Sequence, residues 1–326
     1  MRRREFIQGI VSSLIACPLV AHAQQPTVPV IGLLSPRASS DVPQLMAALR
    51  QGLKDSGYVE GENVTIEYRF AENHNERLAA LAGDLVQRNV AVIVATAVPA
   101  ALAAKAATAT IPIVFEGGED PVQVGLVASL NRPGGNITGV TQLNREVAPK
   151  RLELLHELLP AVSVLALLAN PTDPSSAILS NNTMSVAHTI GVELHVLNAS
   201  TESDFDGVFA NLIKLRIGGL VINPDAFFTA RSKQLGALTL RHAVPAVFEN
   251  REFVAAGGLA SYGGSLIDSY RLTGVYAARV LKGEKPGDLP VQEATKVEFY
   301  INLKAAKALG ITVPLPLLGR ADEVIE

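Results

Sequence analysis

The sequence has little of what disulfides and metal sites require. Its 326 residues include one cysteine, Cys17, and six scattered histidines. A single cysteine cannot close a disulfide within the chain, and the histidines do not show the spacing of zinc ligands. We therefore expect neither a disulfide framework nor a bound metal ion.

Long apolar runs and clusters of basic residues are also missing. The mean hydropathy of +0.26 comes from scattered aliphatic residues, without the stretch of about 20 apolar residues that a membrane span needs. The formal net charge is −3, and no stretch dense in lysine and arginine follows the first four residues. Because nucleic-acid-binding proteins carry basic surfaces, we expect neither an integral membrane protein nor a nucleic-acid partner.

The sequence motifs of several enzyme classes are absent. There is no Gly-x-Ser-x-Gly elbow and no Gly-rich phosphate loop ending in Lys-Ser or Lys-Thr. The first apolar run continues as GLLSP at residues 32–36, not as the Gly-x-Gly-x-x-Gly of dinucleotide-binding proteins. Two carboxylates that are neighbours in the sequence, such as Glu119 and Asp120, do not by themselves indicate a general acid and a general base. These absences predict a protein that is not an enzyme and holds no cofactor.

The first 23 residues have the organisation of a secretory signal peptide. Three arginines at positions 2–4 precede an apolar stretch from 6 to 20, and the small-residue pattern AHA follows at 21–23. An N-terminal core helix is the poorer alternative, because the arginines would lack partners in a core. We therefore predict that residues 1–23 direct the protein to the periplasm and are removed.

Two features bear on the export route. The sequence RREFI at positions 3–7 resembles the twin-arginine pattern, which exports proteins that have already folded. The sequence LIAC ending at Cys17 resembles a lipoprotein signal, but Pro18 follows the cysteine and the AHA site is the better match. Cleavage after Ala23 leaves a chain without cysteine, which suits an oxidising compartment.

Apolar runs and amphipathic segments alternate along the next part of the chain. Residues 28–34, VPVIGLL, are rich in β-branched residues, as is typical of a strand buried on both faces of a parallel sheet. Residues 41–56 place apolar side chains at helical spacing, and Gly57 follows as a stop signal. Further strands are predicted at 64–70, 91–95, 113–115 and 137–140, and further helices at 76–87 and 99–107. This order predicts a doubly wound parallel sheet.

A second series of similar size and order follows. Helices are predicted at 148–159, 175–190, 203–215 and 229–242, and strands at 163–168, 192–197, 219–222, 246–248 and 259–262. The predicted fold class is therefore α/β, with two doubly wound α/β lobes joined by a hinge. We place the first lobe at 28–145 and the second at 146–262.

The remaining segment, residues 263–326, comes after both lobes are complete. It contains a predicted helix at 266–282, an extended stretch at 296–302 and a short helix at 303–309. We expect this segment to recross the hinge and pack on both lobes. Several crossings would restrict the motion of the lobes to a bending closure.

Polar residues gather after the predicted strands of both lobes. In an open parallel sheet, ligands bind outside the carboxyl ends of the strands. We therefore expect a ligand-binding cleft between the lobes, and its candidate residues are Ser35, Thr96, Glu116, Asp120, Asn170, Asp173, Asp225, Phe227, Glu249 and Tyr262.

Several of these candidates also have a purely structural interpretation. Asp173 can be a helix cap, and Asn170 with the proline after it can be an ordinary turn. Phe227 and Tyr262 can fill the core or stack on a planar ligand. Glu116 and Glu249 end apolar strands, where a buried unpaired carboxylate is costly, and this favours a cleft position or an arginine partner.

Several short motifs carry a resemblance to a known family. They are RREFI at 3–7, GYVEG at 57–61, NRPGGNITG at 131–139, KRLELL at 150–155, NP at 170–171, GGLASYG at 257–263 and PVQ at 290–292. Together with the two α/β lobes, these motifs are similar to those of a widespread group of periplasmic substrate-binding proteins of ABC transporters. The resemblance spans nearly the whole mature chain.

The resemblance implies a fold like that of the type I periplasmic binding proteins, whose lobes close on a ligand by hinge bending. It implies a small organic ligand, an ABC permease in the inner membrane as partner, and a monomer. Some relatives accept aromatic amino acids, for which Ser35 or Thr96 would donate to one end and Glu116, Asp120 or Asp225 would accept from the other. A periplasmic sensor subunit for a membrane kinase or chemoreceptor is the alternative function, and an exported enzyme is a third.

Overall fold

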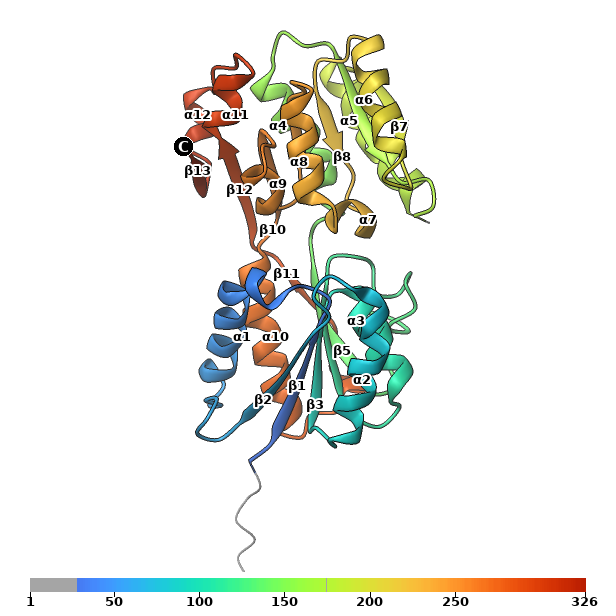
Figure 1. Ribbon diagram of the computed structural model, residues 1–326, viewed down its shortest axis with the longest axis vertical. Helices are drawn as coiled ribbons and strands as arrows, with labels where there is room; N and C mark the ends of the chain where they lie inside the picture. The colour runs from blue at the N-terminus through green and yellow to red at the C-terminus, as the bar shows by residue number, and fades with distance from the viewer. Residues whose placement is uncertain (1–27, 174) are drawn as a thin grey trace, which may run out of the picture.

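The computed structural model describes residues 28–173 and 175–326, which form two lobes stacked along the long axis of the molecule (Figure 1). The predicted signal peptide, the twin-arginine pattern and Cys17 lie outside these residues. Among the helices of the described part, none has both the length and the apolar character needed to cross a bilayer.

The first lobe is a six-stranded sheet in the order β11-β5-β4-β3-β1-β2, and every pairing in it is parallel. Its strands are β1 (Val30–Ser35), β2 (Thr65–Phe70), β3 (Val92–Thr96), β4 (Ile113–Gly117), β5 (Ile137–Gln142) and β11 (Gln292–Ala294). One face is covered by α1 (Pro43–Asp55) and α10 (Leu266–Leu281), and the other by α2 (Leu78–Gln87) and α3 (Val98–Ala107). Short 3-10 helices lie at Ser39–Asp41, Asn75–Arg77 and Pro286–Asp288.

The second lobe is a seven-stranded sheet in the order β13-β12-β10-β9-β8-β6-β7. Its strands are β6 (Val164–Ala169), β7 (Glu193–Asn198), β8 (Leu220–Ile222), β9 (Ala246–Phe248), β10 (Ala260–Gly264), β12 (Val297–Asn302) and β13 (Glu323–Ile325). The pairing of β12 with β10 is antiparallel and the other pairings are parallel.

Helices cover both faces of this second sheet, each over its own hydrophobic core. One core contains side chains of α4 (Ala148–Leu158), α5 (Ser176–Ile190), α11 (Leu303–Ala308) and α12 (Leu315–Leu318). The other contains side chains of α6 (Asp204–Lys214), α7 (Ala226–Thr229), α8 (Ser232–Arg241) and α9 (Arg251–Ala255). The predicted fold class, two doubly wound α/β lobes, is confirmed.

Three segments of the chain cross between the lobes. The first crossing, residues 143–147, joins β5 to α4, the second joins β10 to α10, and the third joins β11 to β12. Residues 263–326 therefore contribute α10 and β11 to the first lobe and β12 and β13 to the second. The short elements β11, β13, α7, α9 and α12 were not predicted, because three to five residues show no hydrophobic period; β8 and β9 are as short, but their apolar runs at 219–222 and 246–248 were predicted as strands.

The helices α1 and α10 lie side by side on the first sheet, blue beside orange in Figure 1, and approach each other through glycines. A Cβ added at Gly52 would lie 1.8 Å from the Arg271 carbonyl oxygen, and one at Gly274 would lie 2.2 Å from the Leu49 carbonyl oxygen. Backbone atoms cannot move aside as a flexible side chain can. The close packing of these helices therefore requires glycine at both positions.

We expect Gly274→Ala to lower the free energy of unfolding by about 2 kcal/mol, because the added methyl group would push α10 away from α1. The matched control is Gly83→Ala in α2, where a Cβ would meet nothing within 4 Å. There alanine should stabilise the helix by about 0.5 kcal/mol or more. Urea unfolding of the two variants measures both effects, and equal stability would show that the helices do not need this approach.

Candidate ligand-binding site

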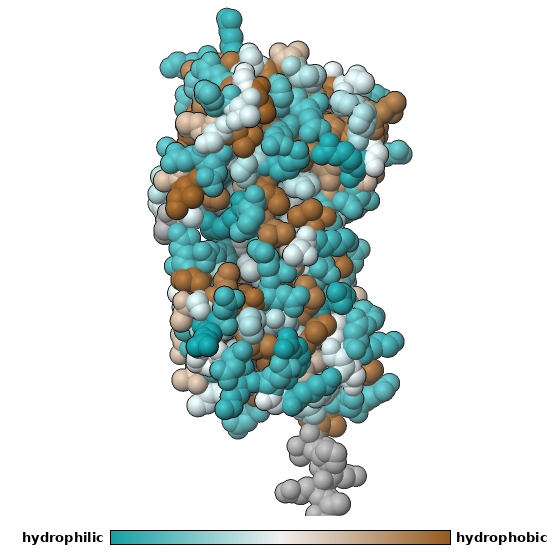
Figure 2. Space-filling model, turned by 180° about the vertical axis from the view of Figure 1, so that it is seen from behind, coloured by the Kyte–Doolittle hydropathy of each residue, from teal (hydrophilic) through white to brown (hydrophobic). Residues whose placement is uncertain are grey.

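A cavity of about 480 Å³ lies between the two lobes and is lined by residues of both. Figure 2, which views the molecule from behind, shows the narrower waist between the lobes at this level. The lining carries more negative than positive side chains. The acids are Asp41, Glu116, Glu119, Asp225, Glu249, Glu252 and Glu298, and the bases are Arg37, Arg145 and Arg251.

On the first-lobe side, Glu116 lies near the end of β4 and is buried. Its Oε1 accepts hydrogen bonds from Gln142 Nε2 and from Ser269 Oγ, the latter at 3.0 Å. Burial raises the pKa of Glu116 above its usual range. The carboxyl group at the floor of the cavity therefore keeps its proton to higher pH than an exposed glutamate does.

The loop after β4 brings a second acid, Glu119, to the cavity. Its pKa is raised to about 7, mainly by burial and further by the charges of Glu249 and Glu116. The loop passes Gly118, where a Cβ would lie 3.3 Å from Asn144 Nδ2, so the backbone approaches the first crossing closely. An acid that titrates near neutral pH thus lies in the wall of the cavity.

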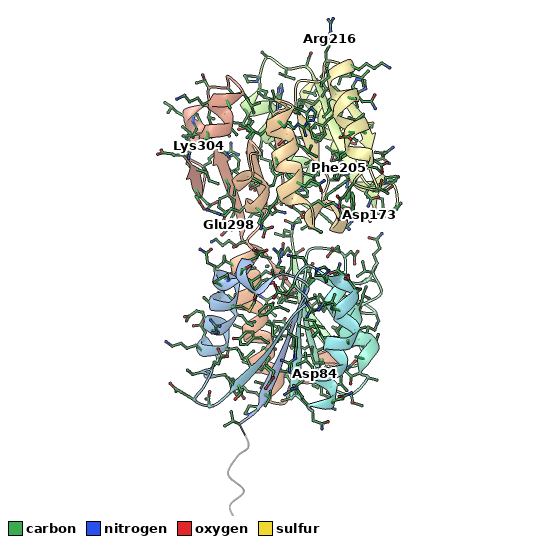
Figure 3. The ribbon with its side chains drawn as sticks, in the orientation of Figure 1. Asp84, Asp173, Phe205, Arg216, Glu298 and Lys304 are labelled. Carbon is green, nitrogen blue, oxygen red and sulfur yellow. The ribbon has the colours of Figure 1, made fainter. Side chains whose placement is uncertain are left out.

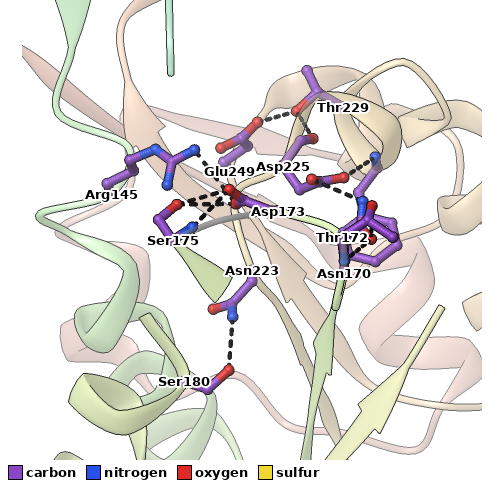
Figure 4. Close-up of polar contacts among 11 residues, drawn as sticks. Arg145, Asn170, Thr172, Asp173, Ser175, Ser180, Asn223, Asp225, Thr229 and Glu249 are labelled. Atoms are coloured by element: carbon purple, nitrogen blue, oxygen red, sulfur yellow. Dashed lines mark hydrogen bonds and ion pairs between the residues drawn. The ribbon is translucent and has the colours of Figure 1, made fainter. Parts of the chain in front are cut away.

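On the second-lobe side, Glu249 follows β9 and Asp225 follows β8. Glu249 Oε1 accepts a hydrogen bond from Thr229 Oγ1, whereas its buried Oε2 has no hydrogen-bond partner among the described residues. Asp225 accepts hydrogen bonds from Asn170 Nδ2 and from the Phe228 backbone N–H, both at 3.1 Å (Figure 4). Burial raises the pKa of both carboxyl groups.

Arg145, in the first crossing, faces these acids. Its Nη2 lies 3.4 Å from Asp173 Oδ2, as Figure 4 shows. Its Nε and Nη1 are buried and have no hydrogen-bond partner within residues 28–173 and 175–326. Because a buried guanidinium with unused donors is costly, Arg145, which lines the cavity, is suited to bind an anionic group of a ligand toward which these nitrogens can turn.

An apolar wall lies on the first-lobe side of the same cavity. It consists of Pro43 and Leu45 at the start of α1 and Leu266 and Ile267 at the start of α10. Ile267 is 41% exposed although it lies in the cleft. The packing of α1 against α10 thus places four apolar side chains where a hydrophobic part of a ligand can lie.

Two ion pairs join the lobes beside the cavity. Arg37 Nη1, from the loop after β1, lies 2.7 Å from Glu252 Oε1 of α9. Lys233 Nζ of α8 lies 3.6 Å from Asp41 Oδ2. These contacts hold the lobes across the opening without filling it.

The structure brings three of the predicted site residues, Glu116, Asp225 and Glu249, to the wall of the cavity. Two more lie directly behind the wall. Asn170 donates a hydrogen bond to Asp225. Asp173 forms an ion pair with Arg145 and accepts hydrogen bonds from the backbone and the side chain of Ser175, just before α5. Figure 3 places Asp173 at the edge of the second lobe that faces the first.

The other five predicted residues do not line the cavity. Ser35 and Thr96 are fully buried at the ends of their strands. Asp120 accepts hydrogen bonds from two backbone N–H groups of its own turn. Phe227 lies under the guanidinium of Arg231, whose Cζ is 4.0 Å from the ring centroid, and Tyr262 packs edge-on against Phe299. For all ten residues, contact with a ligand stays a prediction.

Several lining residues were not among the predicted ones. They are Arg37, Glu119, Gln142, Asn144, Arg145, Glu298 and Tyr300. Ligands bind outside the carboxyl ends of parallel strands, and β5 is such a strand. Its carboxyl end and the residues after it include Gln142, Asn144 and Arg145, so the same rule covers these three residues.

Comparisons with known proteins agree with this geometry. The family model described as "ABC transporter substrate binding protein" matches residues 40–325. The chain is 29% identical over 262 residues to a protein named "Tyrosine-binding protein" from Clostridioides difficile strain R20291. The aligned region covers 79% of this chain and 74% of that protein.

Two solved structures with the same fold extend the comparison. One is a conserved domain protein from Vibrio cholerae O1 biovar El Tor, with a TM-score of 0.78 and 28% identity. The other is an ABC domain in complex with L-Trp from Streptococcus pneumoniae, with a TM-score of 0.78 and 26% identity. Each comparison covers 91% of this chain and 99% of the other. The resemblance seen in the sequence motifs is thereby confirmed, and the chain belongs to the family of ABC transporter substrate binding proteins, which bind small molecules.

Proposed function

We propose that this protein captures an α-amino acid with an aromatic side chain in the cleft between its lobes and presents it to an ABC permease. In this role the protein would act as a monomer in the periplasm, to which residues 1–23 would direct it. Capture and release need no covalent step, so we propose no enzymatic activity. The names of the similar proteins support the ligand class, since one is tyrosine-binding and another holds L-Trp.

The observation that carries this proposal is the pairing of opposite charges inside one cavity. Arg145 has two buried nitrogens without a hydrogen-bond partner among the described residues. Its charge acts on the carboxyl groups of Glu119 in the first lobe and Glu249 in the second. An α-amino acid carries a carboxylate and an ammonium group on one carbon. The carboxylate would bind Arg145 and the ammonium group would bind the acids.

The apolar wall provides for the side chain of such a ligand. A cavity of about 480 Å³ lies within the range of 300 to 1,000 Å³ that is usual for small-molecule sites. Leu45 and Ile267 would cover one face of an aromatic ring. Because the wall belongs to the first lobe whereas Glu249 and Asp225 belong to the second, one ligand would contact both lobes and favour the closed arrangement over the open one.

A thermal-shift comparison tests the ligand class. L-tryptophan and L-tyrosine should raise the melting temperature, since a ligand at 100 times its dissociation constant stabilises a protein by about 2.7 kcal/mol. Tryptamine lacks the carboxylate and indole-3-propionate lacks the ammonium group, so neither should stabilise comparably. Equal shifts with the amino acids and with either analogue would rule out recognition of both charged groups.

A further inference from the structure

The first crossing lies against the end of β10, where the second crossing begins. The Gly264 N–H donates a hydrogen bond to Asn144 Oδ1 at 2.8 Å. A Cβ at Gly263 would lie 2.2 Å from the Glu249 carbonyl oxygen and 2.8 Å from Asn144 Oδ1. The two consecutive glycines therefore allow the end of β10 to pass directly over the first crossing and over Glu249, which carries a cleft carboxylate.

Arg151 of α4 ties the first crossing to β10, the strand that leads into the second crossing. Its side chain is completely buried. Its Nε donates a hydrogen bond to the Tyr262 carbonyl oxygen at 2.7 Å, and its Nη2 donates to the Asn144 carbonyl oxygen at 3.0 Å. One planar guanidinium thus holds the backbone of the first crossing and the backbone of β10 in a fixed relation to one helix.

The same guanidinium faces the cleft acid Glu249. Arg151 Nη2 lies 4.0 Å from Glu249 Oε2, and both Arg151 Nη1 and Glu249 Oε2 lack a hydrogen-bond partner among the described residues. Burial lowers the pKa of Arg151 to about 10, with the charge of Glu249 opposing this shift, so the guanidinium is charged at neutral pH. An apolar side chain at this position would leave the Tyr262 and Asn144 carbonyl oxygens without this donor, so the guanidinium does more than fill space.

We propose that Arg151 is the positioning residue of the hinge, which couples the charge state of Glu249 in the cleft to the arrangement of the first crossing against β10. In the ligand-free protein, the charge of Glu249 attracts the guanidinium, and the guanidinium fixes the first crossing against β10. An ammonium group bound at the Glu249 carboxylate would compete with Arg151 for its charge and thereby change the hold of Arg151 on the Asn144 and Tyr262 carbonyls. This last step rests on the proposed function, whereas the role of Arg151 in the ligand-free hinge does not.

The distance between the lobes in the ligand-free protein is the direct test. Nitroxide labels at Lys54→Cys of α1 and Lys307→Cys of α11, both exposed and in a Cys17→Ser background, report this distance by pulsed electron paramagnetic resonance. Arg151→Lys keeps the charge but cannot span two carbonyl oxygens, and Arg151→Met removes it. Both should shift and broaden the distance distribution relative to the wild type. Unchanged distributions in both variants would overturn the proposal.

A second variant tests the coupling without touching the arginine. Glu249→Gln keeps the size of the side chain and should also shift the ligand-free distribution, whereas Asp225→Asn, another cleft acid that does not contact Arg151, should leave it unchanged. Should the Arg151 variants not fold, this pair decides alone, and identical distributions for Glu249→Gln and Asp225→Asn would refute the coupling.

The affinity for L-tryptophan separates this inference from the proposed function. Arg151→Lys should weaken binding about tenfold, within the range that is common for coupled sites. Failure of the wild type to bind L-tryptophan would refute the proposed ligand and leave the ligand-free distances as the test of the hinge. Binding by Arg151→Lys at the wild-type affinity would refute the coupling to the ligand.

Discussion

Arg145→Met should weaken the binding of L-tryptophan about 100-fold, which corresponds to roughly 3 kcal/mol. The two unused nitrogens of Arg145 are the buried donors that we assign to the ligand carboxylate. Methionine fills a similar volume but donates nothing, so the carboxylate would be buried without its partner. Isothermal titration calorimetry at neutral pH measures the loss.

The control for this prediction is Arg251→Met. Arg251 also lines the cavity, but its guanidinium is already engaged by Glu323 through Nε at 2.8 Å and through Nη2. Its side chain is 52% exposed, so it offers less to a buried ligand than Arg145 does. The affinity should change several-fold at most. A larger loss from Arg251→Met than from Arg145→Met would place the ligand carboxylate at the other arginine.

The affinity for an amino acid should rise about 100-fold between pH 5 and pH 8. The pKa of Glu119 is about 7 in the ligand-free protein because of burial and of the neighbouring Glu249 and Glu116, with Arg145 acting in the opposite sense. An ammonium group binds the ionised carboxylate, so each pH unit below 7 removes about 1.36 kcal/mol of binding free energy. Binding of the ligand should release a proton, which calorimetry in buffers of different ionisation enthalpy detects.

The stability of the ligand-free protein should depend on pH in the opposite direction. Glu119 holds its proton more tightly in the folded chain than at its usual pKa of 4.5. Its contribution to stability is therefore complete below pH 4.5 and is lost as the pH rises through about 7. The ligand-free protein is thus most stable in mildly acidic conditions, whereas its affinity for the ligand is greatest at higher pH.

Two substitutions isolate the effect of Glu119. Glu119→Gln should flatten the pH profile of the affinity, because glutamine has no proton to lose. Glu298→Gln is the control: Glu298 lines the same cavity, but hydrogen bonds from Tyr300, Ser265 and Lys296 outweigh burial and hold its pKa below the usual range. Its replacement should leave the slope of the profile intact. A slope that survives Glu119→Gln would assign the titration to another acid.

The order of strands and helices could be predicted from the sequence because each element carries its own periodic signal. The apolar run at 28–34 became β1, and the amphipathic segment at 266–282 became α10, each within two residues at both ends. The prediction of a cleft at the strand ends also placed Glu116, Asp225 and Glu249 in its wall. Each of these acids lies within three residues of the carboxyl end of a parallel strand, where the rule for ligand sites applies.

The rest of the site could not be predicted from strand order in this way. Glu298 and Tyr300 belong to β12, which runs antiparallel to β10 and therefore brings its amino-terminal end to the cleft. A rule based on carboxyl ends passes over such a strand. Ser35 and Thr96 obey that rule but are completely buried, and the burial of a strand end depends on the packing of the whole lobe.

The entry of α10 and β11 into the first sheet determines which fragments of this protein can exist on their own. Until residue 294 has left the ribosome, the nascent first lobe lacks the strand that covers the edge of β5. A truncated polypeptide ending after β10 would expose both that edge and the apolar face of α1, and it should be a substrate for chaperones and proteases. To express the first lobe separately, the gene would therefore have to be rearranged so that the codons for residues 265–294 directly follow the codon for residue 142.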